Sequence, residues 1–156
     1  MTQPANLAPP RTTRHLDDLR RLAAGDTPQP AVARLIGFVI EHIDLGRSIV
    51  TLDTTERHAN PMGTLHGGIL CDVADAAMGI AFATTLEDDE TFTTLDLACK
   101  FFKPIWTAHL TATAYLVKRT RTLGLLECDI TDDTGSLVAK LYSTCMVLRG
   151  QAATGR

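Results

Sequence analysis

A stretch from Gly67 to about Thr84 constrains the fold more than any other part of the sequence. It reads GGILCDVADAAMGIAFAT, contains no proline, and predicts a helix of about 18 residues and about 27 Å. Apolar residues fall on nearly every side of this helix, and many of them are Ala or Gly. A helix that is apolar all round is expected to be buried all round. The helix is therefore predicted to lie at the centre of the fold.

Four segments after this helix carry β-strand patterns. In chain order they read TFTTLDLACKFF, HLTATAYLVK, LGLLECDI and SLVAKLYSTCMVL, with a DDTG turn signal before the last. In the second segment, Leu110, Ala112 and Ala114 alternate with Thr111 and Thr113. This period is typical of a strand with one buried face.

Two β-branched runs before the helix predict a hairpin. LIGFVIEHI and RSIVTLD lie between Leu35 and Asp53 and flank the turn-prone residues 44–46. A hairpin, a buried helix and an antiparallel meander can bury an apolar helix if the twisted sheet curls around it. The predicted fold class is therefore α+β, with a long central helix wrapped by a curved antiparallel sheet.

The chain has the size of one domain, with 156 residues and 16.9 kDa. Residues 1–30 are predicted to form an N-terminal extension that is partly flexible, residues 31–149 the domain, and residues 150–156 a C-terminal tail. Within the extension, four apolar residues fit a short amphipathic helix that ends at Gly25. They are Leu16, Leu19, Leu22 and Ala23.

Composition excludes several functional classes. A formal net charge of -3 argues against a broad nucleic-acid-binding face. The longest apolar run, residues 76–83, is too short for a membrane span, and the first residues carry no apolar signal core. We therefore expect a cytoplasmic protein with no nucleic-acid or membrane partner. The 4 cysteines are scattered and fit reduced thiols, and neither they nor the 5 histidines form a metal motif.

One concentrated cluster of polar and glycine residues precedes the predicted central helix. It includes Asn60, His66, Gly67 and Gly68, and Asp75 follows nine residues after the histidine. Two glycines at a helix start leave backbone N–H groups unshielded, and the helix dipole adds partial positive charge there. Such an end can stabilise an oxyanion or hold a carbonyl oxygen. Asp75 places a carboxylate in an apolar helix, which is costly unless the carboxylate has a partner or a task.

Each of these residues also has an ordinary structural explanation. A Gly-Gly pair at a helix start can serve only tight packing or a turn. A loop histidine such as His66 can simply hydrogen-bond its own neighbours. Asp72, one turn before Asp75, can be the working carboxylate instead, or either can be solvated or ion-paired. Taken singly, none of these residues decides a function.

Taken together, the residues resemble the hotdog-fold acyl-CoA thioesterases, in the branch of the phenylacetate-pathway thioesterase and the mammalian thioesterase superfamily members. The resemblance covers about residues 33–148. In NPMGTLHGGILCDVADAAMGIA, Asn60 stands six residues before His66, and Asp75 stands where the family has its catalytic carboxylate. In TTLDLACKFFKPI, Thr94 falls where relatives often have a Ser or Thr that positions the attacking water.

This resemblance implies hydrolysis of an acyl-CoA thioester to a free acid and CoA. The N–H of Gly67 or Gly68 polarises the thioester carbonyl, while His66 and Asn60 complete the hold on substrate or water. Asp75 then acts as a general base on water or as a nucleophile that forms an anhydride. Neither a cofactor nor a metal is expected, because the thioester is already activated.

The spacing of these residues predicts an active site shared between two subunits. Gly67 and Asp75 lie eight residues apart on one helix, about 12 Å along its axis. An oxyanion donor and a base have to lie within about 3–4 Å of the same reacting atoms. Two antiparallel copies of the helix around a two-fold axis would bring these groups together. The resemblance likewise implies a homodimer, which is expected to pair into a homotetramer.

The phosphates of CoA need cations, and five basic residues on or beside the predicted strands are candidates. Such residues are more often simply solvated. They are Lys100, Lys103, Lys118, Arg119 and Arg121. Near the acyl end, the small residues Gly79 and Ala83 can admit an acyl group or can simply allow close packing.

Two further functional classes are compatible with a hotdog fold. A hotdog enoyl-CoA hydratase has a catalytic Asp before Asn-Pro and a His two residues after the Pro, whereas residues 58–63 read HANPMG here. A repressor that senses acyl-CoA needs a helix-turn-helix, and the first 30 or so residues supply at most one short helix. A non-catalytic acyl-CoA-binding module is the remaining alternative to the enzyme.

Overall fold

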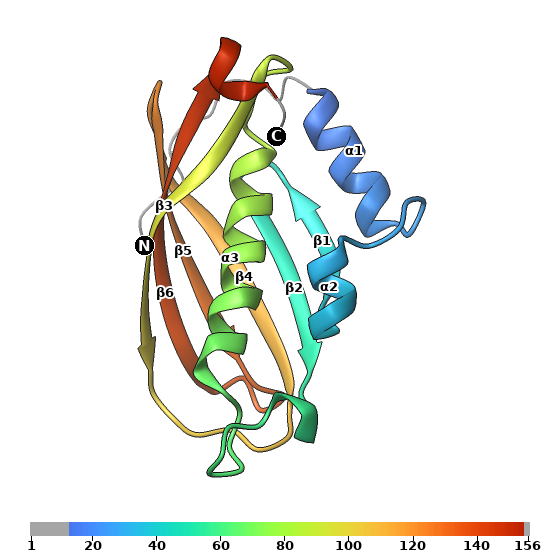
Figure 1. The fold of residues 1–156 in the computed structure, drawn as a ribbon, viewed down its shortest axis with the longest axis vertical. Coiled ribbons are helices and arrows are strands. Elements are labelled where there is room, and N and C mark those ends of the chain that lie inside the picture. Colours follow the sequence, from blue (N-terminus) through green and yellow to red (C-terminus); the bar gives the residue numbers. More distant parts are fainter. Residues whose placement is uncertain (1–12, 155–156) are drawn as a thin grey trace.

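The structure is a computed structural model that describes residues 13–154, so residues 1–12 of the predicted N-terminal extension and residues 155–156 of the predicted tail lie outside the described residues. Six strands form one antiparallel sheet in the order β1-β2-β4-β5-β6-β3, and α3 lies against its inner side in contact with all six (Figure 1). The predicted architecture is confirmed. The elements are α1 (Arg14–Ala23), α2 (Ala31–Ile36), β1 (Val39–Asp44), β2 (Arg47–Asp53), α3 (Gly67–Ala83), β3 (Glu90–Phe101), β4 (His109–Arg119), β5 (Leu123–Thr131) and β6 (Leu137–Arg149), with short 3-10 helices at Glu56–His58 and Gly150–Ala153.

Small residues let the sheet and α3 approach closely. Ala77 is fully buried, and its carbonyl accepts a hydrogen bond from Ser48 Oγ of β2 at 2.6 Å. On β5, a Cβ at Gly124 would lie 2.2 Å from Cε2 of Phe82, so the glycine makes room for that ring. Seven residues of α3 are buried in this way: Leu70, Val73, Ala74, Ala77, Met78, Ala81 and Phe82.

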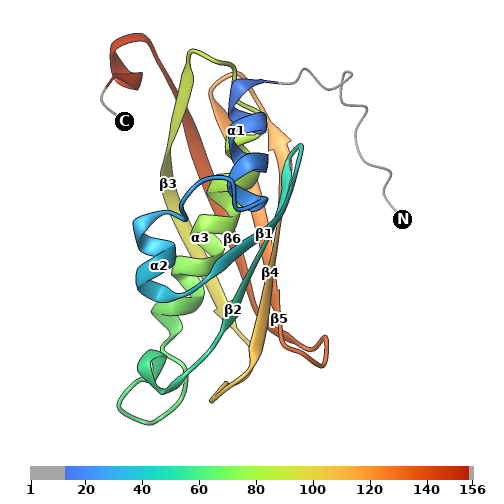
Figure 2. The ribbon, with the colours of Figure 1, turned by 90° about the vertical axis from the view of Figure 1, so that its right-hand side faces the viewer.

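One face of α3 is left open, which corrects the expectation that the helix is buried all round. Asp72 is exposed, and Asp75, Ala76 and Gly79 are only partly buried. These positions recur every three or four residues and therefore lie on one side of the helix. The sheet wraps the other side, while α1 and α2 lie beside part of the open side (Figure 2).

The predicted N-terminal helix is present as α1. Its hydroxyl cap is Thr13, whose side chain accepts from the N–H of Leu16. Leu16 is only 1% exposed and belongs to the main hydrophobic core. The helix is therefore packed onto the domain by its apolar face.

The first strand begins later than predicted, because Leu35 and Ile36 belong to a second short helix, α2. Pro30 precedes this helix, and Gly37 ends it in the left-handed conformation at φ 98°. A proline before a helix and a glycine after it are strong boundary signals. They outweigh the β-branched composition of the run, and β1 starts only at Val39.

Residues 13–154 contain no helix that is long and apolar enough to cross a membrane. The four cysteines are free thiols, with Cys128 and Cys145 buried and Cys71 and Cys99 partly buried. In the same part of the chain, no three His, Cys, Asp or Glu side chains gather as metal ligands would.

Candidate active site

His66 caps the start of α3 with its own ring. Its Nδ1 accepts a hydrogen bond from the Gly68 N–H at 2.9 Å, so the neutral ring carries its proton on Nε2. The ring is exposed, and its Nε2–H is available to an acceptor. Within the described residues, the Gly67 N–H has no acceptor. The helix start thus offers two donors, Gly67 N–H and His66 Nε2–H, while Gly68 N–H is already used.

Both glycines at the helix start also make room for a neighbouring ring. A Cβ at Gly67 would lie 2.9 Å from Cζ of Phe101, whose ring covers this position. A Cβ at Gly68 would lie 2.9 Å from Nδ1 of His66. The structural explanation of the Gly-Gly pair therefore holds alongside the functional one.

Substitution of Gly68 by Ala tests how tightly the helix start holds the imidazole. The added methyl group displaces the His66 ring and weakens its bond to the helix. We expect kcat/KM for thioester hydrolysis to fall about 10- to 100-fold, since small misplacements of a catalytic group are this costly. Steady-state kinetics beside thermal unfolding measure the effect, and an unchanged rate would make the cap irrelevant to activity.

Asn60 holds the loop that leads into the helix. Its Oδ1 accepts from the N–H groups of Met62 at 2.9 Å and Thr64 at 3.3 Å, and its Nδ2 donates to Thr64 Oγ1 at 2.8 Å. The next two residues are held as well, because Leu65 N–H donates to Ile105 O and His66 N–H donates to His58 O. The structure thus shows Asn60 positioning the loop before His66, and its role toward substrate stays a prediction.

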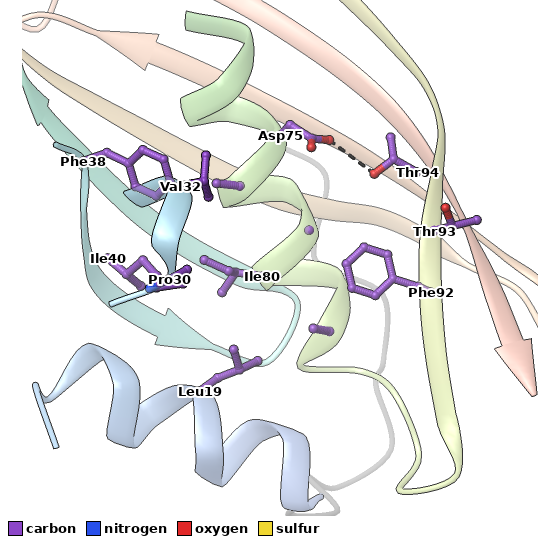
Figure 3. Close-up of a pocket in the computed structure, with 13 residues that line it drawn as sticks. Leu19, Pro30, Val32, Phe38, Ile40, Asp75, Ile80, Phe92, Thr93 and Thr94 are labelled. Atoms are coloured by element: carbon purple, nitrogen blue, oxygen red, sulfur yellow. Dashed lines mark hydrogen bonds between the residues drawn. The ribbon is translucent and has the colours of Figure 1, made fainter. Parts of the chain in front are cut away.

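Asp75 is the carboxylate that the structure equips with a partner. Thr94 Oγ1 of β3 donates to Asp75 Oδ1 at 3.3 Å, as the dashed line in Figure 3 shows. Asp75 is partly buried and lines a cavity. Asp72, the alternative carboxylate, is exposed and does not line that cavity. The pairing of Asp75 with Thr94 agrees with the two positions that the resemblance singles out.

A β-bulge in β3 lies next to Thr94. The register of β3 against β6 shifts between Thr94 and Asp96, so Leu95 is an extra residue. Side-chain hydrogen bonds connect β3 to β6 at the bulge. Asp96 Oδ1 accepts from Thr144 N–H at 3.0 Å, and the Asp96 carbonyl accepts from Ser143 Oγ at 2.9 Å. Bulges of this kind re-aim side chains beside functional sites.

Because of this bulge, successive turns of α3 each contact one side chain of β3. Without it, residues 92, 94, 96, 98 and 100 would all face the helix. Instead Phe92 lies against Gly79, Thr94 against Asp75, Cys99 against Cys71 and Phe101 against Gly67. Burial, and then the neighbouring Cys71 thiol, raises the pKa of Cys99 to about 12. The bulge therefore lets one strand serve both Asp75 and the helix start.

A cavity of about 480 Å³ lies along the open face of α3, and we call it the α3 trough (Figure 3). Its floor is formed by Asp75, Ala76, Gly79, Ile80 and Ala83. One wall is β3, with Phe92, Thr93 and Thr94, and the other carries Pro30, Val32, Phe38 and Ile40. Leu19 of α1 closes the end away from Asp75. The two small residues singled out in the sequence, Gly79 and Ala83, are both part of the floor.

Sequence reasoning missed the wall of the trough opposite β3, which carries Pro30, Val32, Phe38 and Ile40 and which we call the outer wall. The amphipathic pattern around Leu19 predicts that α1 has an apolar face, but it does not predict what that face packs against. Phe38 and Ile40 read only as parts of a strand. Their position along the trough depends on the packing of α1 and α2.

The five predicted phosphate-binding cations do not form one patch within the chain. Arg119 donates to Glu90 at 3.1 Å and lies 5.2 Å from the centroid of the Phe82 ring, near the end of α3. Lys103 donates to Asp132, which lowers the pKa of that carboxyl. Within residues 13–154, three of the five form no ion pair: Lys100, Lys118 and Arg121. Lys100 lies between Cys99 and Phe101, which face α3, so its side chain is on the opposite face of β3.

The family model for the thioesterase superfamily matches residues 62–139, half of the chain. The chain belongs to the thioesterase superfamily. This match includes the start of α3, Asp75 and Thr94. The expected family and hotdog fold are thereby confirmed, together with the expected enzyme class, a thioester hydrolase.

Individual members of the thioesterase superfamily match over most of their length. A 1,4-dihydroxy-2-naphthoyl-CoA hydrolase of Listeria monocytogenes is 31% identical over 112 residues, which are 72% of this chain and 89% of that protein. Human acyl-coenzyme A thioesterase 13 is 29% identical over 97 residues, 61% of this chain and 69% of that protein. A phenylacetic acid degradation-related protein of Ralstonia eutropha has a structure with a TM-score of 0.74 and 32% identity, covering 81% of this chain and 97% of that one.

Proposed function

We propose that this thioesterase hydrolyses acyl-CoA to a free acid and CoA, with Asp75 as the catalytic carboxylate. The observation that carries the proposal is the α3 trough, an apolar cavity that has the Asp75–Thr94 pair at one end. The names of the Listeria and human relatives, an acyl-CoA hydrolase and an acyl-coenzyme A thioesterase, support CoA as the thiol.

In the proposed mechanism, Asp75 acts as a general base. A water that donates its two hydrogens to Asp75 Oδ2 and Thr94 Oγ1 is held with its oxygen toward the thioester carbon. Asp75 takes one proton as the C–O bond forms, the C–S bond then breaks, and the CoA thiolate leaves and takes up a proton. In the nucleophilic alternative, Asp75 attacks the thioester carbon first and the CoA thiolate leaves, which forms a mixed anhydride. Water that attacks the Asp75 carbonyl carbon of this anhydride would leave ¹⁸O in the Asp75 carboxylate after a single turnover in ¹⁸O-water.

The oxyanion donors of the proposed site belong to the other subunit of a homodimer. Gly67 N–H and His66 Nε2–H lie at the start of α3, about 12 Å along the axis from Asp75. A two-fold axis beside the open face of α3 would place one subunit's helix start at the other subunit's Asp75. Association of two such dimers into a tetramer stays a prediction, as does the contact of Lys100, Lys118 and Arg121 with CoA phosphates.

Release of free thiol tests the proposed function. Purified protein is mixed with a panel of aromatic, short-chain and long-chain acyl-CoAs, and thiol is measured with a chromogenic disulfide. We expect turnover of at least one group of substrates. Binding of acyl-CoA without thiol release would instead identify the non-catalytic binding module, and hydration of an enoyl-CoA without thiol release would identify the hydratase.

The proposed mechanism needs no cofactor, because the thioester is already activated and each step uses a group of the chain. We expect activity to survive exhaustive treatment with a chelator such as EDTA, followed by gel filtration. Thiol release before and after treatment is the measurement. Loss of activity that a divalent ion restores would contradict the cofactor-free mechanism.

A further inference from the structure

A second cavity, of about 310 Å³, adjoins the α3 trough beyond its closed end. Two residues line both cavities, Leu19 of α1 and Ala83 of α3. His15, Asp18, Arg21 and Thr27 also line the second cavity. Leu19 and Ala83 therefore form a partition between the two cavities, and only Leu19 contributes a large side chain to it.

The polar side chains of the trough are confined to the end nearest the candidate carboxylate. They are Asp75, Thr93 and Thr94, and the side chains from there to Leu19 are apolar. A hydroxyl or charged group at the far end of an acyl chain would lose its water without gaining a partner, which is costly. The trough therefore fits an apolar acyl group whose thioester lies at Asp75.

The length of the trough floor limits the length of the acyl chain that the trough can hold. Asp75 and Ala83 are eight residues apart on α3, so the floor between them is about 12 Å long. An extended chain advances about 1.2 Å per bond, because an extended peptide residue has three backbone bonds and spans about 3.5 Å. About ten bonds, or about eleven atoms, therefore span the floor. Because the thioester carbon and the terminal methyl group each need room at the ends, this corresponds to a straight acyl group of about eight to ten carbons.

We propose that Leu19 is the chain-length stop of this enzyme, which selects straight, apolar acyl groups of about eight to ten carbons. This inference rests on the proposed function. Leu19 is partly buried on a helix that is docked onto the domain, because Leu16 is only 1% exposed and Arg14 N–H donates to Asp88 Oδ1 at 3.0 Å. An end wall on a docked helix is expected to exclude longer chains.

Two opposite substitutions of Leu19 test the proposal, with kcat/KM measured for straight-chain acyl-CoAs from butanoyl to hexadecanoyl. Leu19→Ala opens the partition, and we expect kcat/KM for dodecanoyl-CoA relative to octanoyl-CoA to rise about tenfold. Each further CH₂ removed from water contributes about fourfold in affinity. Leu19→Trp shortens the trough, and kcat/KM for hexanoyl-CoA relative to decanoyl-CoA should rise by about the same factor.

Leu22→Ala is the matched control. Leu22 lies on the same helix and lines the second cavity but not the trough. Its removal takes the same side chain from α1 while leaving the end wall in place, so the preferred chain length should not move. If wild-type protein hydrolyses acyl-CoAs and neither Leu19 variant shifts the preferred length, the Leu19 proposal is wrong and the proposed function stands.

Failure of the proposed function would be visible separately, as absence of thiol release by wild-type protein with every acyl-CoA. The same variants are then compared by calorimetric binding of octanoyl-CoA and dodecanoyl-CoA. A shift of relative affinity toward the longer chain in Leu19→Ala would support Leu19 as the stop. Equal relative affinities in wild type and both variants would overturn it.

Discussion

Replacement of Asp75 by Asn lowers kcat for acyl-CoA hydrolysis by at least about 100-fold, which is the scale of losing a general base. The Asn side chain has the size of the carboxylate and can still accept the hydrogen bond from Thr94 Oγ1. It cannot take a proton from water or attack the thioester carbon, so both mechanistic routes are blocked. Steady-state thiol release gives kcat, and calorimetric binding of the acyl-CoA should show that affinity is retained.

Asp72→Asn is the control, because it removes the same charge from the same helix one turn earlier. Asp72 is exposed and does not line the trough, so this variant should retain most of its activity. The opposite result, with Asp72 essential and Asp75 dispensable, would place the catalytic carboxylate one helical turn away from the trough.

Two inactive variants should restore activity to each other when their subunits exchange. His66→Ser keeps an oxygen that can cap α3 but removes the imidazole, and Asp75→Asn removes the carboxylate. A heterodimer of the two has one intact shared site and one site that is damaged twice. At random exchange half of the dimers are mixed, so about a quarter of the wild-type activity should return.

Subunit exchange is followed independently, with a different affinity tag on each variant, and the mixed dimer is purified through both tags. Each variant alone is carried through the same procedure and should stay inactive. A purified mixed dimer without activity would show that His66 and Asp75 act within one chain, and it would rule out the shared site.

Local sequence patterns predict much of the fold because the signals along α3 agree with one another. The run from Gly67 to Thr84 has no helix breaker, and the structure ends the helix at Ala83 with Thr84 as its cap. The candidate site was predictable for a related reason. Burial of a carboxylate is costly in free energy unless the group has a partner or a task, so Asp75 within an apolar helix indicates a candidate site.

Features that depend on packing between distant segments are not visible in the same way. The bulge at Leu95 leaves no local mark, because the alternation of β3 can be read in either phase. The open face of α3 carries Asp72 and Asp75 among small and apolar residues, and only the extent of the sheet shows that this face is left uncovered. The end wall at Leu19 needs the docking of α1, which involves residues far away in the sequence.

The two tasks of the proposed enzyme are encoded in separate stretches of the chain. The groups proposed to act on the thioester come from residues 60–94, whereas the outer and end walls of the trough come from residues 19–40. Under the Leu19 proposal, changes within residues 19–40 are therefore expected to alter the accepted acyl group while the groups at residues 60–94 stay in place. Grafting this N-terminal segment between relatives would show whether it acts as an exchangeable specificity module.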